Sequence, residues 1–189
     1  MNKVIVETSA RHLHLTQEAV DALFGAGYQL TKKKDLSQPG QYACAEKVEV
    51  VGPKGSLMMS ILGPTRPESQ VEVSFTDARA LGITAPVRES GDIAGTPGVT
   101  LKVGENTYEM KEGVIVAKRH IHLTPAAAAE FGVQDKQIVK VKVSGTGRAI
   151  IFDDVVIRVK DSFAPAMHID TDECNAAAAF GTIEGEIIA

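Results

Sequence analysis

The stretch ARHLHLTQEAV at residues 10–20 returns as KRHIHLTPAAA at residues 118–128. The chain has five histidines in 189 residues, and four of them lie in this repeat. An apolar VIV segment precedes each copy, at 4–6 and 114–116, and each copy runs on to a Phe-Gly pair. Thr16 and Thr124 can cap the short helix that follows each His-x-His, with Gly25 and Gly132 closing it. The repeat therefore predicts two related halves.

Short strands dominate the rest of the sequence. Alternating or continuous apolar runs bounded by Gly and Pro predict strands at 47–51, 56–62, 71–75, 99–103, 107–110, 138–143, 148–152 and 155–159. Short helices are expected after Asp77 and after Thr171 or Asp172. Strands and helices do not alternate regularly, so the expected fold is mainly β with short helices, arranged as two tandem, pseudo-twofold-related β-barrel halves.

The boundary between the halves is expected in the polar segment at 104–113. This gives a first half at 10–112 and a second at 113–189. Residues 1–9 either complete the first half or contribute a strand to the second, and both alternatives stay open at this point.

Composition excludes several classes of protein. Apolar residues make up 44% and charged residues 23% of the chain, as in ordinary soluble domains. A net charge of −4, 5% aromatic residues and no Trp argue against nucleic-acid binding. No apolar window is long enough to span a membrane, and the N-terminus lacks the pattern of a signal peptide. We therefore predict a cytoplasmic protein in which Cys44 and Cys174 are free thiols.

The duplicated His-x-His pattern predicts metal binding. Residues two apart on a strand point to the same face, so both imidazoles of a pair can reach one cation. A solvated pair at a strand end would explain one His-x-His but not the repetition of its neighbours. Imidazole ligands suit zinc, although ligand type alone also fits nickel, copper or iron. The predicted ligands in the repeat are His12, His14, His120 and His122.

Two further ligands follow from aligning the halves. When VEVSFTDARALG (71–82) is compared with MHIDTDECNAA (167–177), Glu72 falls opposite His168. Five histidines and one carboxylate give three ligands for each of two metals, which leaves each metal an open position, as in catalytic sites. Arg66, held between two prolines in LGPTRP, presents a planar guanidinium suited to phosphate.

Long motifs across residues 4–180 carry a family resemblance. The segments SARHLHL, GYQLTKKKDLSQPGQ, VVGPKG, LGPTRPESQVEVSFTDARALGI, PVRESGD, EGVIVAKRHIHLTP and MHIDTDECNA resemble the PduL-type phosphotransacylases. These are phosphate propanoyltransferases of microcompartment-associated metabolism such as propanediol degradation. The resemblance implies two tandem β-barrel halves, a dinuclear zinc centre, and the reaction acyl-CoA + phosphate ⇌ acyl phosphate + CoA, with propanoyl-CoA or acetyl-CoA as substrate.

The resemblance also assigns residues. It places the metal ligands on His12, His14, Glu72, His120, His122 and His168, the phosphate contact on Arg66, and polar site positions on Ser9, Lys34 and Asn175. Many family members carry an N-terminal extension that directs them into a microcompartment. Here the first expected strand begins at Val4, so targeting by that route is not expected. A homo-oligomer is compatible with the sequence.

Two alternatives use the same ligands. A dinuclear zinc hydrolase would cleave thioesters or phosphoesters without needing phosphate as acceptor. A non-enzymatic metal-dependent binding module would hold fully ligated metals and turn over no acyl-CoA. No spacing typical of a Ser-His-Asp or Cys-His nucleophile is present, so direct transfer is expected rather than a covalent acyl-enzyme.

Overall fold

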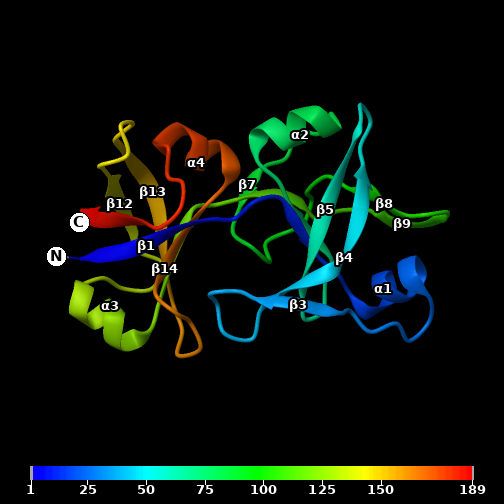
Figure 1. Cartoon of the computed structure of the whole chain (residues 1–189), viewed down its shortest axis with the longest axis horizontal. Coiled ribbons are helices and arrows are strands. Elements are labelled where there is room, and N and C mark those ends of the chain that lie inside the picture. Colours follow the sequence, from blue (N-terminus) through cyan, green and yellow to red (C-terminus); the bar gives the residue numbers. More distant parts are fainter. Residues whose placement is uncertain (1, 189) are drawn as a thin grey trace. The chain divides into compact units, whose positions relative to one another are not determined.

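The computed structural model describes residues 2–188, and the chain divides into two units with separate hydrophobic cores. The barrel unit comprises Met1–Ser9, Ser37–Pro39 and Lys118–Ala189. The sheet unit comprises Ala10–Leu36 and Gly40–Ala117. Among the described residues the regular structure is strand-rich, with four short helices (Figure 1). The expected class, mainly β with short helices and barrel-like halves, is confirmed.

The barrel unit is a closed six-stranded barrel. In spatial order its strands are β1 (Lys3–Thr8), β14 (Ala166–Ile169), β11 (His120–Leu123), β13 (Ile150–Val159), β12 (Ile138–Val143) and β15 (Ile183–Ile188). Closure comes from the antiparallel pairing of β1 with β15, which brings the two ends of the described chain side by side (Figure 1). Helices α3 (Pro125–Phe131) and α4 (Thr171–Ala177) follow β11 and β14.

The sheet unit is built on a nine-stranded sheet. Its order is β7 (Val87–Arg88), β10 (Val114–Ala117), β6 (Gln70–Glu72), β2 (His12–His14), β5 (Ser56–Gly63), β4 (Tyr42–Val51), β8 (Val99–Val103) and β9 (Asn106–Met110), with β3 (Lys32–Asp35) paired to β4. Helices α1 (Gln17–Phe24) and α2 (Phe75–Leu81) follow β2 and β6. Leu13, Ile61 and Val71 from its central strands are fully buried, so the His-x-His strand crosses the middle of this core.

The two units share a local arrangement around each His-x-His strand. β2 is parallel to β5 and antiparallel to β6, and β11 is parallel to β13 and antiparallel to β14. A further parallel neighbour, β10 or β1, lies beyond β6 or β14. The two units exchange this neighbouring strand. β1 leads into β2 of the sheet unit along the chain but pairs with β14 in the barrel unit, and β10 leads into β11 of the barrel unit but pairs with β6 in the sheet unit.

Several expected element boundaries are wrong, among them the strand expected at 71–75, which ends at Glu72 because Ser74 and Phe75 begin α2. The strands expected at 148–152 and 155–159 are one strand, β13, because pairing with β12 continues across a register shift between Val139 and Val141, where Asp154 takes a left-handed φ of 52°. Helix α2 is capped by Ser74 rather than opened by Asp77, and α4 is capped by Asp170 rather than by Thr171 or Asp172. In both helices an acidic side chain at the third position returns to the cap N–H, which fixes the start earlier than expected.

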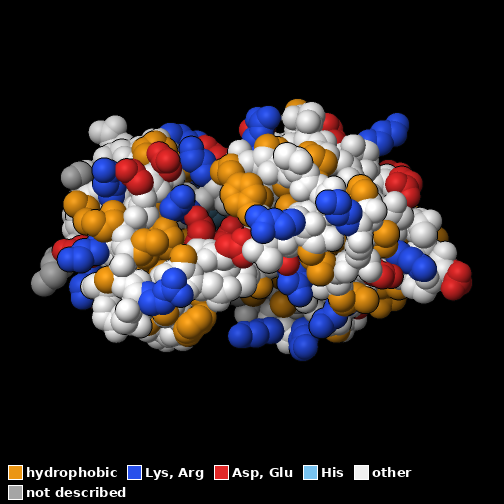
Figure 2. Space-filling model, turned by 90° about the horizontal axis from the view of Figure 1, so that it is seen from above, with side chains coloured by type: hydrophobic (Ala, Val, Ile, Leu, Met, Phe, Trp, Pro, Cys, Tyr) orange, Lys and Arg blue, Asp and Glu red, His pale blue; other side chains and the backbone are white. Residues whose placement is uncertain are grey.

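The surface gives no sign of a large single-sign patch on the face seen in Figure 2, where acidic, basic and hydrophobic side chains are interspersed. Within residues 2–188, no helix is long and apolar enough to cross a membrane. Cys44 and Cys174 are both buried free cysteines.

Candidate active site

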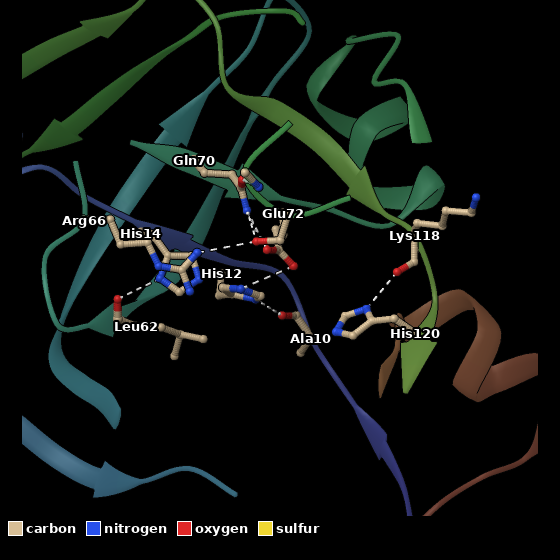
Figure 3. Close-up of polar contacts among 11 residues, drawn as sticks. Ala10, His12, His14, Leu62, Arg66, Gln70, Glu72, Lys118 and His120 are labelled. Atoms are coloured by element: carbon tan, nitrogen blue, oxygen red, sulfur yellow. Dashed lines mark hydrogen bonds and ion pairs between the residues drawn. The ribbon is translucent and has the colours of Figure 1, made fainter. Parts of the chain in front are cut away.

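The sheet unit gathers His12, His14 and Glu72 into a buried group whose ligand atoms lie within 4.8 Å of one another. β2 supplies both histidines, and β6 places Glu72 directly across from His12 in the antiparallel register. The three residues are 6%, 2% and 9% exposed. His12 Nε2 lies 3.5 Å from Glu72 Oε2. The strand geometry thus turns two nitrogens and one oxygen toward one point (Figure 3).

Backbone carbonyls fix the tautomers of both rings. His12 Nδ1 lies 2.9 Å from the oxygen of Ala10, and His14 Nδ1 lies 3.1 Å from the oxygen of Leu62. A carbonyl can only accept, so Nδ1 carries the hydrogen in each case. In the neutral ring Nε2 then keeps its lone pair, which is the arrangement that orients a metal-binding histidine.

The barrel unit gathers His120, His122 and His168 in the same way, again with ligand atoms within 4.8 Å of one another. His120 and His122 come from β11, and β14 places His168 across from His120. His120 Nδ1 lies 2.8 Å from the oxygen of Lys118, the counterpart of the contact between His12 and Ala10. Glu7 Oε2 lies 3.7 Å from His168 Nδ1.

The donor sets fit zinc. Two imidazoles with a carboxylate, and three imidazoles, are both ligand sets of zinc sites that keep an open position. His122 Nδ1 is buried and makes no hydrogen bond among the described residues, which is costly for a polar atom unless a further partner binds it. Nickel, copper and iron accept the same ligands, so the choice of metal stays a prediction.

Electrostatics keep one histidine of each group neutral. Burial lowers the pKa of His14 to about 3, and the positive charges of His12 and Arg66 act in the same direction. Burial likewise lowers the pKa of His122 to about 2, assisted by His120 and His168. For His12, burial lowers the pKa, but the charge and hydrogen bond of Glu72 together with the hydrogen bond to Ala10 outweigh burial, so the net pKa is raised. Neutral imidazole is the form that binds a metal.

Arg66 lies beside the histidines of the sheet unit, close enough for its charge to lower the pKa of His14. Its backbone N–H bonds to Leu15 O at 2.8 Å, and its Nη1 donates to Ser90 Oγ at 3.4 Å. The preceding turn begins at Gly63, which lies across from Tyr42. A Cβ on Gly63 would clash with the ring of Tyr42, so a larger residue where β5 leads into the loop that carries Arg66 would require that ring to move.

The other predicted site residues lie at separate places. Ser9 directly follows β1, and its N–H bonds to Ile169 O at 2.7 Å in the barrel unit. Asn175 is exposed on α4 of the same unit. Lys34 is exposed on β3 of the sheet unit, across from Ala43. Their roles in binding CoA stay predictions.

Sequence reasoning missed the groups that support the third ligand of each site. Gln70 Nε2 donates to Glu72 Oε1 at 2.6 Å in the sheet unit, and Ser37 Oγ donates to Glu7 Oε2 at 2.5 Å in the barrel unit. A signal existed for Gln70, since it precedes Glu72 by two residues on one strand and so shares its face. For Glu7 the signal lies only in the pairing of β1 with β14.

Arg11 and Arg119, which precede the two His-x-His pairs, make equivalent ion pairs. Arg11 Nη1 lies 2.9 Å from Asp77 Oδ1, and Arg119 Nε lies 3.0 Å from Glu173 Oε1. Both acids are the third residue of a capped helix, α2 or α4. Each arginine therefore ties the start of a histidine strand to the first turn of the helix that follows the third ligand.

The fold and the two ligand groups define a two-unit β protein with one candidate metal site in each unit. Comparison with known proteins extends this: the profile of the phosphate propanoyltransferase family matches residues 5–180, and the chain belongs to that family of transferases.

Named relatives agree with the family match. A phosphate propanoyltransferase of Listeria monocytogenes is 57% identical over 186 residues, covering 98% of this chain and 87% of the relative. One from Enterococcus faecalis is 60% identical over 176 residues, covering 93% and 83%. One from Thermotoga maritima is 55% identical over 176 residues, covering 92% and 83%.

Proposed function

We propose that the chain is a phosphate acyltransferase that interconverts propanoyl-CoA and phosphate with propanoyl phosphate and CoA by direct transfer, using two zinc ions. One zinc is held by His12, His14 and Glu72, and the other by His120, His122 and His168. The observation that carries the proposal is that each unit of a family transferase presents three converging ligands rather than four. Three protein ligands leave a position for a reactant.

The chain's own residues have distinct tasks in this reaction. A phosphate oxygen attacks the thioester carbonyl carbon, a C–O bond forms, the C–S bond breaks and CoA leaves through its sulfur. Bound zinc would supply Lewis acidity for the acyl or phosphoryl oxygens and would favour the thiolate of CoA. Arg66 binds phosphate with its planar guanidinium and stabilises the charge on the attacking group. The carbonyls that hold Nδ1 of His12, His14 and His120 keep the ligand nitrogens oriented.

Ser9, Lys34 and Asn175 are proposed as polar contacts to CoA. Lys34 is exposed and cationic, which suits a phosphate of the nucleotide. Ser9 and Asn175 both belong to the barrel unit and offer uncharged donors. The acyl group is expected to be short, with propanoyl-CoA the first substrate to test and acetyl-CoA the second.

The decisive experiment measures phosphate-dependent loss of acyl-CoA by the purified zinc-loaded chain. CoA release is followed with a thiol reagent, and acyl phosphate is trapped as a hydroxamate. Transfer requires equal amounts of the two products, no CoA release without phosphate, and intersecting initial-rate plots. CoA release independent of phosphate would instead establish a hydrolase, and parallel plots with a trapped acyl-enzyme would exclude direct transfer.

A separate measurement addresses whether the two ions form one dinuclear centre. Replacing zinc with Co(II) gives each ion an unpaired spin. Magnetic coupling between two cobalt ions, seen by low-temperature paramagnetic resonance, is the expected result. Two independent cobalt signals would reject the dinuclear centre while leaving phosphate-dependent transfer intact.

A further inference from the structure

Gln70 is a buried polar side chain, 3% exposed, in the middle of the sheet unit. Its Nε2 donates to Glu72 Oε1 at 2.6 Å (Figure 3). The same Nε2 donates to Ser90 Oγ at 2.9 Å, and Gln70 Oε1 accepts the N–H of Gly91 at 2.7 Å. The backbone N–H of Gly91 can only donate, so it fixes which way the amide points. Both amide hydrogens are therefore directed, one to Glu72 and one to Ser90.

The amide divides the two oxygens of Glu72 between different partners. Oε1 receives the Gln70 hydrogen bond, whereas Oε2 lies 3.5 Å from His12 Nε2. A carboxylate held in this way presents one chosen oxygen to the point shared by His12 and His14. Gln70 also lies across from His14 in the β2–β6 register, so its backbone is part of the ladder that carries the ligands.

Ser90 joins this group to Arg66. Its Oγ receives Gln70 Nε2 at 2.9 Å and Arg66 Nη1 at 3.4 Å. The segment that follows β7 and carries Ser90 is held to Gln70 a second time through the N–H of Gly91. Movement of the amide is thereby linked to both the ligand carboxylate and the guanidinium.

We propose that Gln70 is a positioning residue that holds Glu72 in its metal-binding orientation and, through Ser90, aligns Arg66 with the same site. The proposed role of Gln70 in holding Glu72 predicts an effect of Gln70 on zinc affinity, and it needs no assumption about the reaction. The part concerning Arg66 rests on the proposed use of phosphate. The barrel unit provides an internal reference, because His168 is supported there by Glu7 and Ser37 instead.

The test uses the full chain with Gln70→Leu, which keeps approximate size but removes both donors and the acceptor. Gln29→Leu, at an exposed position on the same unit, is the matched control. Zinc is stripped and each variant is titrated in competition with a chromophoric chelator. We expect Gln70→Leu to lower the affinity for one of the two zinc ions by about 10–100-fold, the range found for outer partners of metal ligands. The affinity for the other zinc ion should not change.

Ser90→Ala separates the two roles. It keeps the bond between Gln70 and Glu72, so both zinc affinities should stay within about threefold of the unaltered chain, well below the effect of losing an outer partner. The KM for phosphate should rise several-fold while the KM for propanoyl-CoA does not change. An unchanged phosphate KM would reject the link to Arg66.

Two results would overturn the role of Gln70 itself. One is a folded Gln70→Leu chain that binds both zinc ions as tightly as the control, and the other is equal weakening of both ions, which indicates general destabilisation. If Gln70→Leu does not fold, Gln70→Asn answers the same question, because its buried amide is one methylene too short to reach Glu72. A failed transfer assay with these zinc results intact would reject the proposed function alone.

Discussion

The two ligand groups differ in one residue on a shared framework. β2 and β6 place His12 opposite Glu72, and β11 and β14 place His120 opposite His168. The strand directions, the Nδ1 contacts of His12 and His120, and the arginine ion pairs all correspond. The sheet unit thus has a carboxylate where the barrel unit has a third imidazole.

This difference shows that strand pairing supplies geometry while the side chain supplies charge. A zinc ion bound by two neutral imidazoles and a carboxylate carries one positive charge less than a zinc ion bound by three imidazoles. The charged surroundings of the two groups also differ, since Arg66 lies beside the group of the sheet unit, which contains the carboxylate. The charges of Glu72 and Arg66 therefore oppose each other in the sheet unit, whereas the three predicted ligands of the barrel unit include no carboxylate.

The largest effect is expected when a ligand is removed from either group. His12→Ala and His120→Ala should each lower zinc from about two to about one per chain and reduce transfer by more than about 100-fold, beyond the range for outer partners. The reason is that each deletes one of only three ligands. Metal analysis of folded protein checks this, with Gln29→Leu as control. Two zinc ions retained in both variants would refute the ligand assignment.

Arg66→Ala should lower kcat/KM for phosphate and leave zinc binding unchanged. Loss of a charge-assisted bidentate contact costs about 1.5–3 kcal/mol, or about one to two decades in kcat/KM for phosphate. Zinc content should not change, because Arg66 is not a ligand. Arg66→Lys should restore activity only in part, since an ammonium keeps the charge but loses the fork. A raised KM for CoA with an unchanged KM for phosphate would place Arg66 at the nucleotide end.

Replacing Glu72 with histidine directly tests whether the two ligand groups are equivalent. Glu72→His gives the sheet unit the ligand set of the barrel unit, so zinc content should stay near two per chain. Transfer should nevertheless fall by about tenfold, as when an outer partner of a metal site is lost, because Gln70 and Arg66 no longer face a carboxylate. Loss of one zinc in this variant would mean that the two frameworks are not equivalent.

The smallest effect is expected at the arginine ion pairs. Arg11→Ala and Arg119→Ala should each lower stability by less than about 1 kcal/mol, because both pairs are partly exposed. Arg119→Ala should cost more, since Arg119 also lies over the ring of Phe152 at 5.4 Å. Thermal unfolding at constant zinc content measures the difference. A larger loss for Arg11→Ala would contradict this ranking.

Local sequence predicted much of the site. His-x-His on a strand places both rings on one face, and Thr16 and Thr124 cap α1 and α3 as expected. The alignment that set Glu72 against His168 agrees with their equivalent registers opposite His12 and His120. Cap positions at α2 and α4 were predicted less well, because Ser74 and Asp170 compete with neighbouring Thr and Asp residues that can also cap.

The sequence by itself determined the strand-rich class, the pairing of histidines within each copy and the equivalence of the third ligands. These follow from a two-residue strand period and from capping, which depend on residues close together in the chain. Only the tertiary structure decided that β1 and β10 are exchanged between units, that Gln70 contacts both Glu72 and Ser90, and that Glu7 lies beside His168. Those contacts join residues distant in the chain, and strand propensity does not specify which strand a given edge will pair with.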